Sequence, residues 1–302
     1  MSVDWVSIAI LSTAVLGLVN IFDSHLVSRR MPSLRAFLLP ASIVILAYGL
    51  VLFYLFPLPE DIGIWPLTVT IASGIIRTIS VTIMLYIMKK EEVSRVIPLV
   101  STYPVFVAIM AVLFLGETLY YLQWIAIMIV VAGAVMVSAR WSPGGSTTWL
   151  GASFFLLIGA SLLMAVANVT AKYALAYVSF WNMYCIGAFC MSGLFLLISL
   201  RPHIFQELGN MKQRDSALTL VAVNETLVMI GAVLLFWAME RGPVSLVSTI
   251  VSSRSVFVVI YALILSRVSP IFLEWHYGRR MLALRLIAIT MIVGGIAIIY
   301  LT

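Results

Sequence analysis

The chain has 302 residues, of which 63% are hydrophobic and only 10% are charged, and its formal net charge is +6. Soluble domains carry about 25% charged residues, so this chain has too little polar surface to stay folded in water. The composition therefore indicates an integral helical membrane protein. Its positive charge is then expected in loops that face anionic lipid and set the topology, which argues against a nucleic-acid partner.

A membrane-spanning helix needs about 20 mostly apolar residues. Ten segments meet this requirement, so we expect an all-α membrane protein with ten transmembrane helices. In chain order, the predicted spans are residues 5–25, 36–56, 64–88, 93–115, 121–139, 149–173, 180–200, 216–239, 244–265 and 283–301.

The basic residues are unevenly distributed among the predicted loops. Loops that follow odd-numbered spans hold 14 of the 18 Lys and Arg residues. Because cytoplasmic loops carry an excess of Lys and Arg, we expect these loops in the cytoplasm and both termini outside, in the plasma (inner) membrane. The segment 269–282 mixes apolar and basic residues, which is typical of either a short interfacial helix or a simple loop.

The apolar segment at residues 91–117 is echoed at 242–268, an offset of 151 residues. Without gaps, residues 93–109 and 244–260 are identical at 9 of 17 positions. At an offset of 148, polar landmarks of the first span also match the sixth: Thr13, Gly17, Asn20 and Ser24 correspond to Ser161, Ala165, Asn168 and Lys172.

Five spans per unit is an odd number, so a second unit would cross the membrane in the opposite sense. We therefore expect two inverted five-helix repeats, residues 1–146 and 147–302. Inverted repeats place a binding site near the midplane at their interface and rock about it for alternating access.

The run from Ser94 through Pro98, Tyr103–Phe106 and Gly116–Glu117, followed by Gln123–Trp124 and Gly133, resembles the end of an EamA-type domain of the drug/metabolite transporter superfamily. The resemblance covers essentially the whole chain as two five-helix units. It implies a ten-helix carrier that exports or exchanges small metabolites. The second unit departs from the pattern, with Ser266–Arg267 in place of the Gly–Glu pair. The family usually keeps both termini in the cytoplasm, whereas the basic residues here indicate the reverse.

Arg77 lies near the centre of the third span and Arg254 near the centre of the ninth. A charge at that depth costs about 2.5–3.5 kcal/mol, so such a residue normally faces a cavity or a partner. With Lys172 as a third cation and Glu225 as the acid, we predict that the cations bind an anionic substrate such as a carboxylate or phosphate ester. The planar guanidinium suits both groups because it bonds them bidentately.

Glu225 leaves several interpretations open. It could form a structural ion pair with one arginine, act as counter-ion in the empty carrier, or carry a proton that drives transport. It could also recognise cationic or neutral amphipathic compounds, which is the main alternative function, beside that of a lipid-linked sugar flippase.

Further candidates for substrate binding lie on the same spans. Asn20 and Asn168 could contact substrate or simply bond neighbouring helices. The remaining candidates are Tyr103, Asn224, Ser73 and Ser252 for substrate binding and Pro98 and Pro104 for gating, because proline removes backbone donors and bends helices.

An enzyme is not expected. His25, His203 and His276 fall at helix ends or in loops, and no catalytic motif accompanies them. We expect no cofactor and no metal. The expected partners are a small-molecule substrate, the lipid bilayer and either protons or a counter-substrate, with the chain as a monomer or homodimer.

Overall fold

The computed structural model describes residues 4–59, 62–90, 96, 99–138, 152–268 and 279–302, and every regular element within them is a helix. Helices suit this chain because they satisfy their own backbone N–H and C=O groups where lipid offers no water. In chain order they are α1 (Trp5–His25), the π-helix η1 (Leu26–Arg30), α2 (Leu34–Leu55), α3 (Ile64–Lys90), α5 (Tyr103–Leu115), α6 (Tyr121–Ser138), α7 (Ala152–Ala174), α8 (Phe180–Ser199), α9 (Pro202–Gly209), α10 (Arg214–Arg241), α11 (Val244–Ser252), α12 (Arg254–Val268) and α13 (Arg279–Leu301).

Several of these helices can cross a membrane. Within the described residues, seven helical segments are long and apolar enough to do so, judged by length and composition. They are Trp5–Arg30, Leu34–Leu55, Ile64–Lys90, Ser153–Ala174, Phe180–Ser199, Arg214–Arg241 and Val244–Tyr261. Shorter apolar helices lie at Tyr103–Leu115, Tyr121–Met136 and Leu286–Leu301. The prediction of an all-α, multi-pass membrane protein is therefore confirmed.

Two predicted spans are interrupted by turns within the described residues. In the predicted span 93–115, residues 99–100 are helical, the next two residues form a turn, and α5 begins at Tyr103. The predicted span 244–265 is divided at Ser253 into α11 and α12. At each interruption the backbone bonds instead span three residues, from Thr102 to the Leu99 carbonyl and from Ser253 to the Ile250 carbonyl.

Each interruption has a local chemical cause. Pro104 lies in the first turn of α5, where its missing N–H costs nothing but prevents the helix from continuing backwards. In the second case the Ser253 hydroxyl donates to the Ile250 carbonyl at 2.6 Å. Such a side-chain bond competes with the regular backbone ladder.

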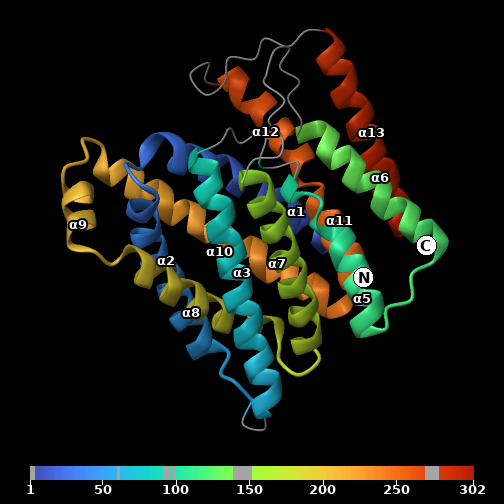
Figure 1. Ribbon diagram of the computed structural model, residues 1–302, viewed down its shortest axis with the longest axis horizontal. Helices are drawn as coiled ribbons and strands as arrows, with labels where there is room; N and C mark the ends of the chain where they lie inside the picture. Colours follow the sequence, from blue (N-terminus) through green and yellow to red (C-terminus); the bar gives the residue numbers. More distant parts are fainter. Residues whose placement is uncertain (1–3, 60–61, 91–95, 97–98, 139–151, 269–278) are drawn as a thin grey trace.

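The helices pack mainly in pairs drawn from opposite ends of the sequence, as Figure 1 shows. α1 packs along α10, α3 along α7, α2 against α8, and α6 against α13. α11 contacts α1, α5, α6 and α7, and every one of its residues is buried. Polar groups from several helices can therefore meet around α11, away from lipid.

The α6–α13 pair is in close contact through glycine. A Cβ added at Gly133 would lie 2.7 Å from Ile292 Cγ1 and 2.9 Å from the Ala288 carbonyl oxygen. A Cβ added at Gly295 would lie 2.5 Å from Val130 Cγ2. Glycine at a crossing lets two membrane helices approach closely, which is the packing mode available without a hydrophobic driving force between them.

The pairs α1–α10 and α3–α7 each contain a hydrogen bond from a serine hydroxyl to a backbone carbonyl. The two bonds lie at corresponding positions, but the serine is on the opposite helix of the pair. Ser12 Oγ on α1 donates to the Gly231 carbonyl on α10 at 2.8 Å. Ser80 Oγ on α3 donates to the Ala160 carbonyl on α7 at 2.7 Å. Gly231 lies 151 residues after Ser80, and Ala160 lies 148 residues after Ser12. Corresponding positions are therefore bonded in both pairs, with the donor on opposite helices.

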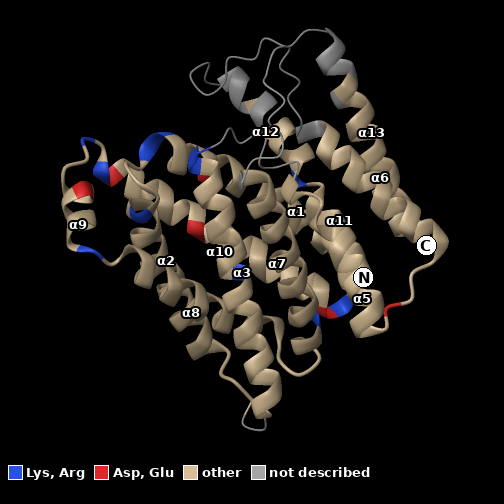
Figure 2. Cartoon of the chain, viewed as in Figure 1, with Lys and Arg blue, Asp and Glu red and all other residues tan. Residues whose placement is uncertain are grey.

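Charged residues are concentrated near the ends of the bundle (Figure 2). Lys and Arg gather at the end where α9 lies, and only isolated charged positions interrupt the apolar middle. Charges are expensive in the hydrocarbon region, so the few that lie there are candidates for function.

Candidate functional site

Arg77 is held between α3 and α7 by neutral partners. Its Nη2 donates to Asn168 Oδ1 at 2.8 Å, and its guanidinium carbon lies 5.1 Å from the ring centroid of Phe236. Asn168 Nδ2 in turn donates to Ser248 Oγ on α11 at 3.3 Å. The arginine is thus fixed in position while its charge stays unneutralised by these contacts.

Tyr103 connects this arginine to Arg254. Its hydroxyl donates to the Ser248 carbonyl at 3.1 Å, and both arginines interact electrostatically with this phenol group. The Nε atoms of Arg77 and Arg254 are buried without a hydrogen-bond partner. In the described part of the chain neither arginine has a carboxylate within ion-pair distance. Arg77, Tyr103 and Arg254 therefore form a cationic cluster, which we name the arginine cluster.

A second cluster lies between α1 and α10. Asn224 Nδ2 donates to Asp23 Oδ1 at 2.9 Å and to Glu225 Oε1 at 3.2 Å. Asn224 Oδ1 is buried without a partner. We name Asp23, Asn224 and Glu225 the carboxyl cluster. The ion pair of Glu225 with an arginine, one of the interpretations left open by the sequence, is absent from the described residues, and Glu225 instead shares Asn224 with a second acid.

Two carbonyls at the helix interruptions, which already accept backbone N–H groups from three residues further on, also lie near hydroxyls of neighbouring helices. Thr13 Oγ1 on α1 lies 3.4 Å from the Ile250 carbonyl at the end of α11. Ser161 Oγ on α7 donates to the Leu99 carbonyl at 3.2 Å. Thr13 and Ser161 are the landmarks paired by the offset of 148, and Leu99 and Ile250 are 151 residues apart.

Glu117 stabilises the start of α11. Its carboxylate accepts the backbone N–H of Val244 at 2.6 Å and also accepts from the backbone and hydroxyl of Ser245. An acid at a helix N-terminus satisfies otherwise unpaired N–H groups and interacts favourably with the helix dipole. Glu117 therefore caps the N-terminus of α11.

Comparison with known proteins decides the family. The model of the EamA-like transporter family matches residues 4–139. This match supports membership of the drug/metabolite transporter superfamily. A solved crystal structure has a similar fold, with a TM-score of 0.70 over 98% of this chain and 95% of that chain at 17% identity. No curated protein sequence matches the chain. The family makes it an integral multi-pass membrane transporter of small molecules.

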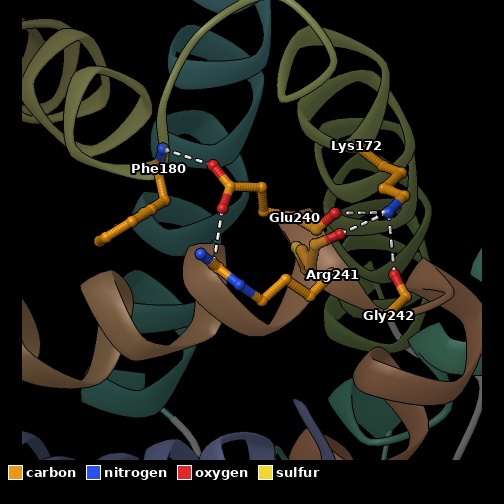
Figure 3. Close-up of polar contacts among 6 residues, drawn as sticks. Lys172, Phe180, Glu240, Arg241 and Gly242 are labelled. Atoms are coloured by element: carbon orange, nitrogen blue, oxygen red, sulfur yellow. Dashed lines mark hydrogen bonds and ion pairs between the residues drawn. The ribbon is translucent and has the colours of Figure 1, made fainter. Parts of the chain in front are cut away.

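Lys172 belongs to neither cluster, and Figure 3 shows its contacts at the end of α10. Its Nζ donates to the carbonyls of Met239 and Gly242 at 2.6 and 2.9 Å, and it also reaches the Glu240 carbonyl. Lys172 thus caps the C-terminal end of α10 rather than joining the two arginines at the midplane. The reason is its place in the last turn of α7, from which the long stem reaches carbonyls at the bundle's end.

The other candidate residues differ in their hydrogen bonds and in their places along the helices. Ser73 donates to the Ala167 carbonyl at 2.8 Å, and Ser252 donates to Thr249 within its own helix at 2.7 Å. Asn20 has no side-chain hydrogen bond to a described residue, unlike its counterpart Asn168. Pro104 starts α5 rather than bending it, and Pro98 lies outside the described residues.

Asp23 is the functional candidate that the sequence interpretation missed. It lies near the end of the predicted first span, where an acid is easily taken for a boundary residue. The depth argument that identified Arg77 applies to it equally, because an ionisable side chain within an apolar span is a candidate by default. No group of three or more His, Cys, Asp or Glu side chains suited to a metal ion occurs within the described residues.

Proposed function

We propose that the EamA-type transporter carries a small anionic metabolite, bound by the arginine cluster. The observation that carries this proposal is that Arg77 and Arg254 both interact electrostatically with Tyr103, and neither has a carboxylate within ion-pair distance in the described residues, although Arg254 also interacts at longer range with Asp23. Uncompensated buried cations are costly. A carboxylate or phosphate ester offsets that cost and accepts bidentate bonds from each guanidinium.

We further propose that the transporter works by alternating access between two inverted repeats, residues 1–146 and 147–302. Three features support the repeat: the interruptions before Tyr103 and at Ser253, the matched hydroxyl-to-carbonyl bonds, and the reversed serine contacts. The boundary at residue 146 lies outside the described residues. Rocking of one repeat against the other would expose the arginine cluster to each side in turn.

The test of the anion proposal is uptake into proteoliposomes from a panel of organic acids, sugar phosphates, amino acids and organic cations. Arg77→Gln and Arg254→Gln should each abolish transport of the accepted anion while the protein still folds. Arg241→Gln is the matched control, because Arg241 pairs with Glu240 at the bundle's end. Normal transport in both arginine variants would overturn the proposal.

The carboxyl cluster favours a second function, in which Asp23 and Glu225 carry a proton or recognise a cationic group. Its support is that two acids share one amide donor and that Asn224 Oδ1 has no partner. If a proton drives transport, Asp23→Asn or Glu225→Gln should remove the response to a pH gradient yet retain exchange of substrate. If these variants fail with cations while the arginine variants stay active, the carrier is a cation exporter.

We also propose that both termini lie outside the cell and the basic loops inside. The support is the concentration of Lys and Arg at one end of the bundle. In cells, a membrane-impermeant maleimide should label a cysteine introduced at Thr302 but not one at Arg201. The opposite labelling pattern would place the termini in the cytoplasm.

A further inference from the structure

A pocket of about 420 Å³ lies between the α1–η1 segment and α10, separate from both clusters. Arg30 and His25 line it from one side, and Ser216, Thr219, Leu220 and Val223 line it from α10. Two contacts fix its depth in the bundle. Arg30 bonds Gln213 at the start of α10, and Asp23 bonds Asn224 two to three turns further along that helix.

The lining changes from polar to apolar along this direction. Ser216 and Thr219 are exposed and lie nearest the start of α10, whereas Leu220 and Val223 lie deeper. Val223 is 44% exposed and lies on the outside of an apolar bundle, so this part of the pocket opens toward lipid. A polar mouth above an apolar, lipid-facing groove matches the shape of a phospholipid.

Arg30 has capacity for a further ligand. Its Nε donates to His25 Nε2 at 3.2 Å, and its Nη1 donates to Gln213. A guanidinium has five N–H donors, so these two bonds fix its orientation and leave donors for an anion. The neighbouring Arg29 and Arg214 are exposed, and one acid, Asp215, lies beside them on α10. The positive charge at the mouth therefore favours an anionic group.

We propose that this pocket binds an acidic phospholipid, with the phosphate on Arg30 and an acyl chain against Leu220 and Val223. Basic pockets between membrane helices at the positively charged face recognise acidic headgroups in this way. The ligand bridges α1 and α10, which come from opposite halves of the chain. The site adds a lipid partner and does not depend on which substrate the arginine cluster takes.

The test measures thermal unfolding of the purified full-length protein with added phosphatidylglycerol or phosphatidylcholine of identical acyl chains. Phosphatidylglycerol should raise the unfolding temperature more than phosphatidylcholine does. Arg30→Gln should remove this difference and weaken phosphatidylglycerol binding about tenfold or more, the scale of one lost charge-assisted contact. Arg201→Gln, which removes an exposed charge outside the pocket, should leave the difference intact.

A second variant guards against misfolding of Arg30→Gln. Thr219→Trp fills the groove from an exposed position and leaves every charge in place, and it should also abolish the phosphatidylglycerol effect. The proposal is overturned if both pocket variants keep the effect, or if Arg201→Gln loses it equally, which would indicate a diffuse basic surface. It is also overturned if inorganic phosphate alone reproduces the stabilisation of the wild-type protein.

Discussion

Arg77 and Arg254 differ in how their guanidinium groups are held. Arg77 donates to Asn168 and lies over the Phe236 ring, so its position is set before any ligand arrives. Arg254, the first residue of α12, makes no hydrogen bond to a described residue through its side chain. We infer that Arg77 provides a fixed contact and Arg254 an adaptable one. Ligand binding then costs less side-chain entropy at Arg77 than at Arg254.

Asn168 and Asn20 give a matched pair of substitutions at corresponding positions. Asn168→Leu leaves Arg77 Nη2 and Ser248 without their partner and should destabilise the protein by about 1–2 kcal/mol. Asn20→Leu removes no such bond and should change stability little. Thermal unfolding in detergent checks both variants. Equal losses would mean that the Arg77–Asn168 bond does not hold the α3–α7 pair.

The sequence located the two arginines because a lone charge in a long apolar run stands out. The sequence did not give the depth of Lys172 in the membrane. Helical spacing assigns a residue to a face of the helix, whereas Lys172 lies in the last turn of α7. For Glu225 the sequence left several roles open, because attraction between opposite charges does not by itself identify a partner. Its partner depends on how α1 and α10 pack, which brings Asp23 to the same amide.

At the scale of helices, apolar length predicts where an element lies but not where it breaks. About 20 apolar residues give a strong signal for a span. The interruption at Ser253 instead depends on a hydrogen bond from the Ser253 hydroxyl to the Ile250 carbonyl. Thr13 on α1 lies near the same carbonyl. The Thr13 contact joins residues that are distant in the sequence, so no local sequence pattern reveals it.

The α6–α13 crossing makes a prediction about neighbouring glycines. Gly133→Ala would place Cβ 2.9 Å from the Ala288 carbonyl oxygen, so the two backbones must separate, at about 1–3 kcal/mol. Gly294→Ala meets nothing within 4 Å and should be neutral or slightly stabilising, because alanine favours helix. Comparing the unfolding temperatures of the two variants checks this. A larger loss for Gly294→Ala would show that the helices do not cross at Gly133.

At the scale of the whole molecule, the Glu117 contact joins the loop after α5 to the start of α11, and so links the first half of the chain to the second. If the halves rock, this contact must break in each cycle. Cysteines at Glu117 and Ser245, joined by a short thiol-reactive cross-linker in a background without Cys185 and Cys190, should stop transport. Cleaving the linker should restore it.

The control for this cross-link is a pair at the same end within one half. Phe180 and Glu240 are in contact through a backbone N–H and a carboxylate oxygen at 3.3 Å, and both lie in the second half. Linking cysteines at these positions should leave transport largely intact. Full activity with the Glu117–Ser245 link in place would rule out movement at this end of the bundle.

The reversed serine bonds have a consequence for how such proteins diverge. Ser12 faces Gly231 and Ser80 faces Ala160, so one helix–helix bond is kept while the amino acid that makes it has changed sides. In a comparison of residue types between the two units, Ser12 and Ala160 differ, and so do Ser80 and Gly231. If the two units share an ancestor, this contact has been kept although the residue types that make it differ, and bonded positions then trace the relationship where residue identity does not.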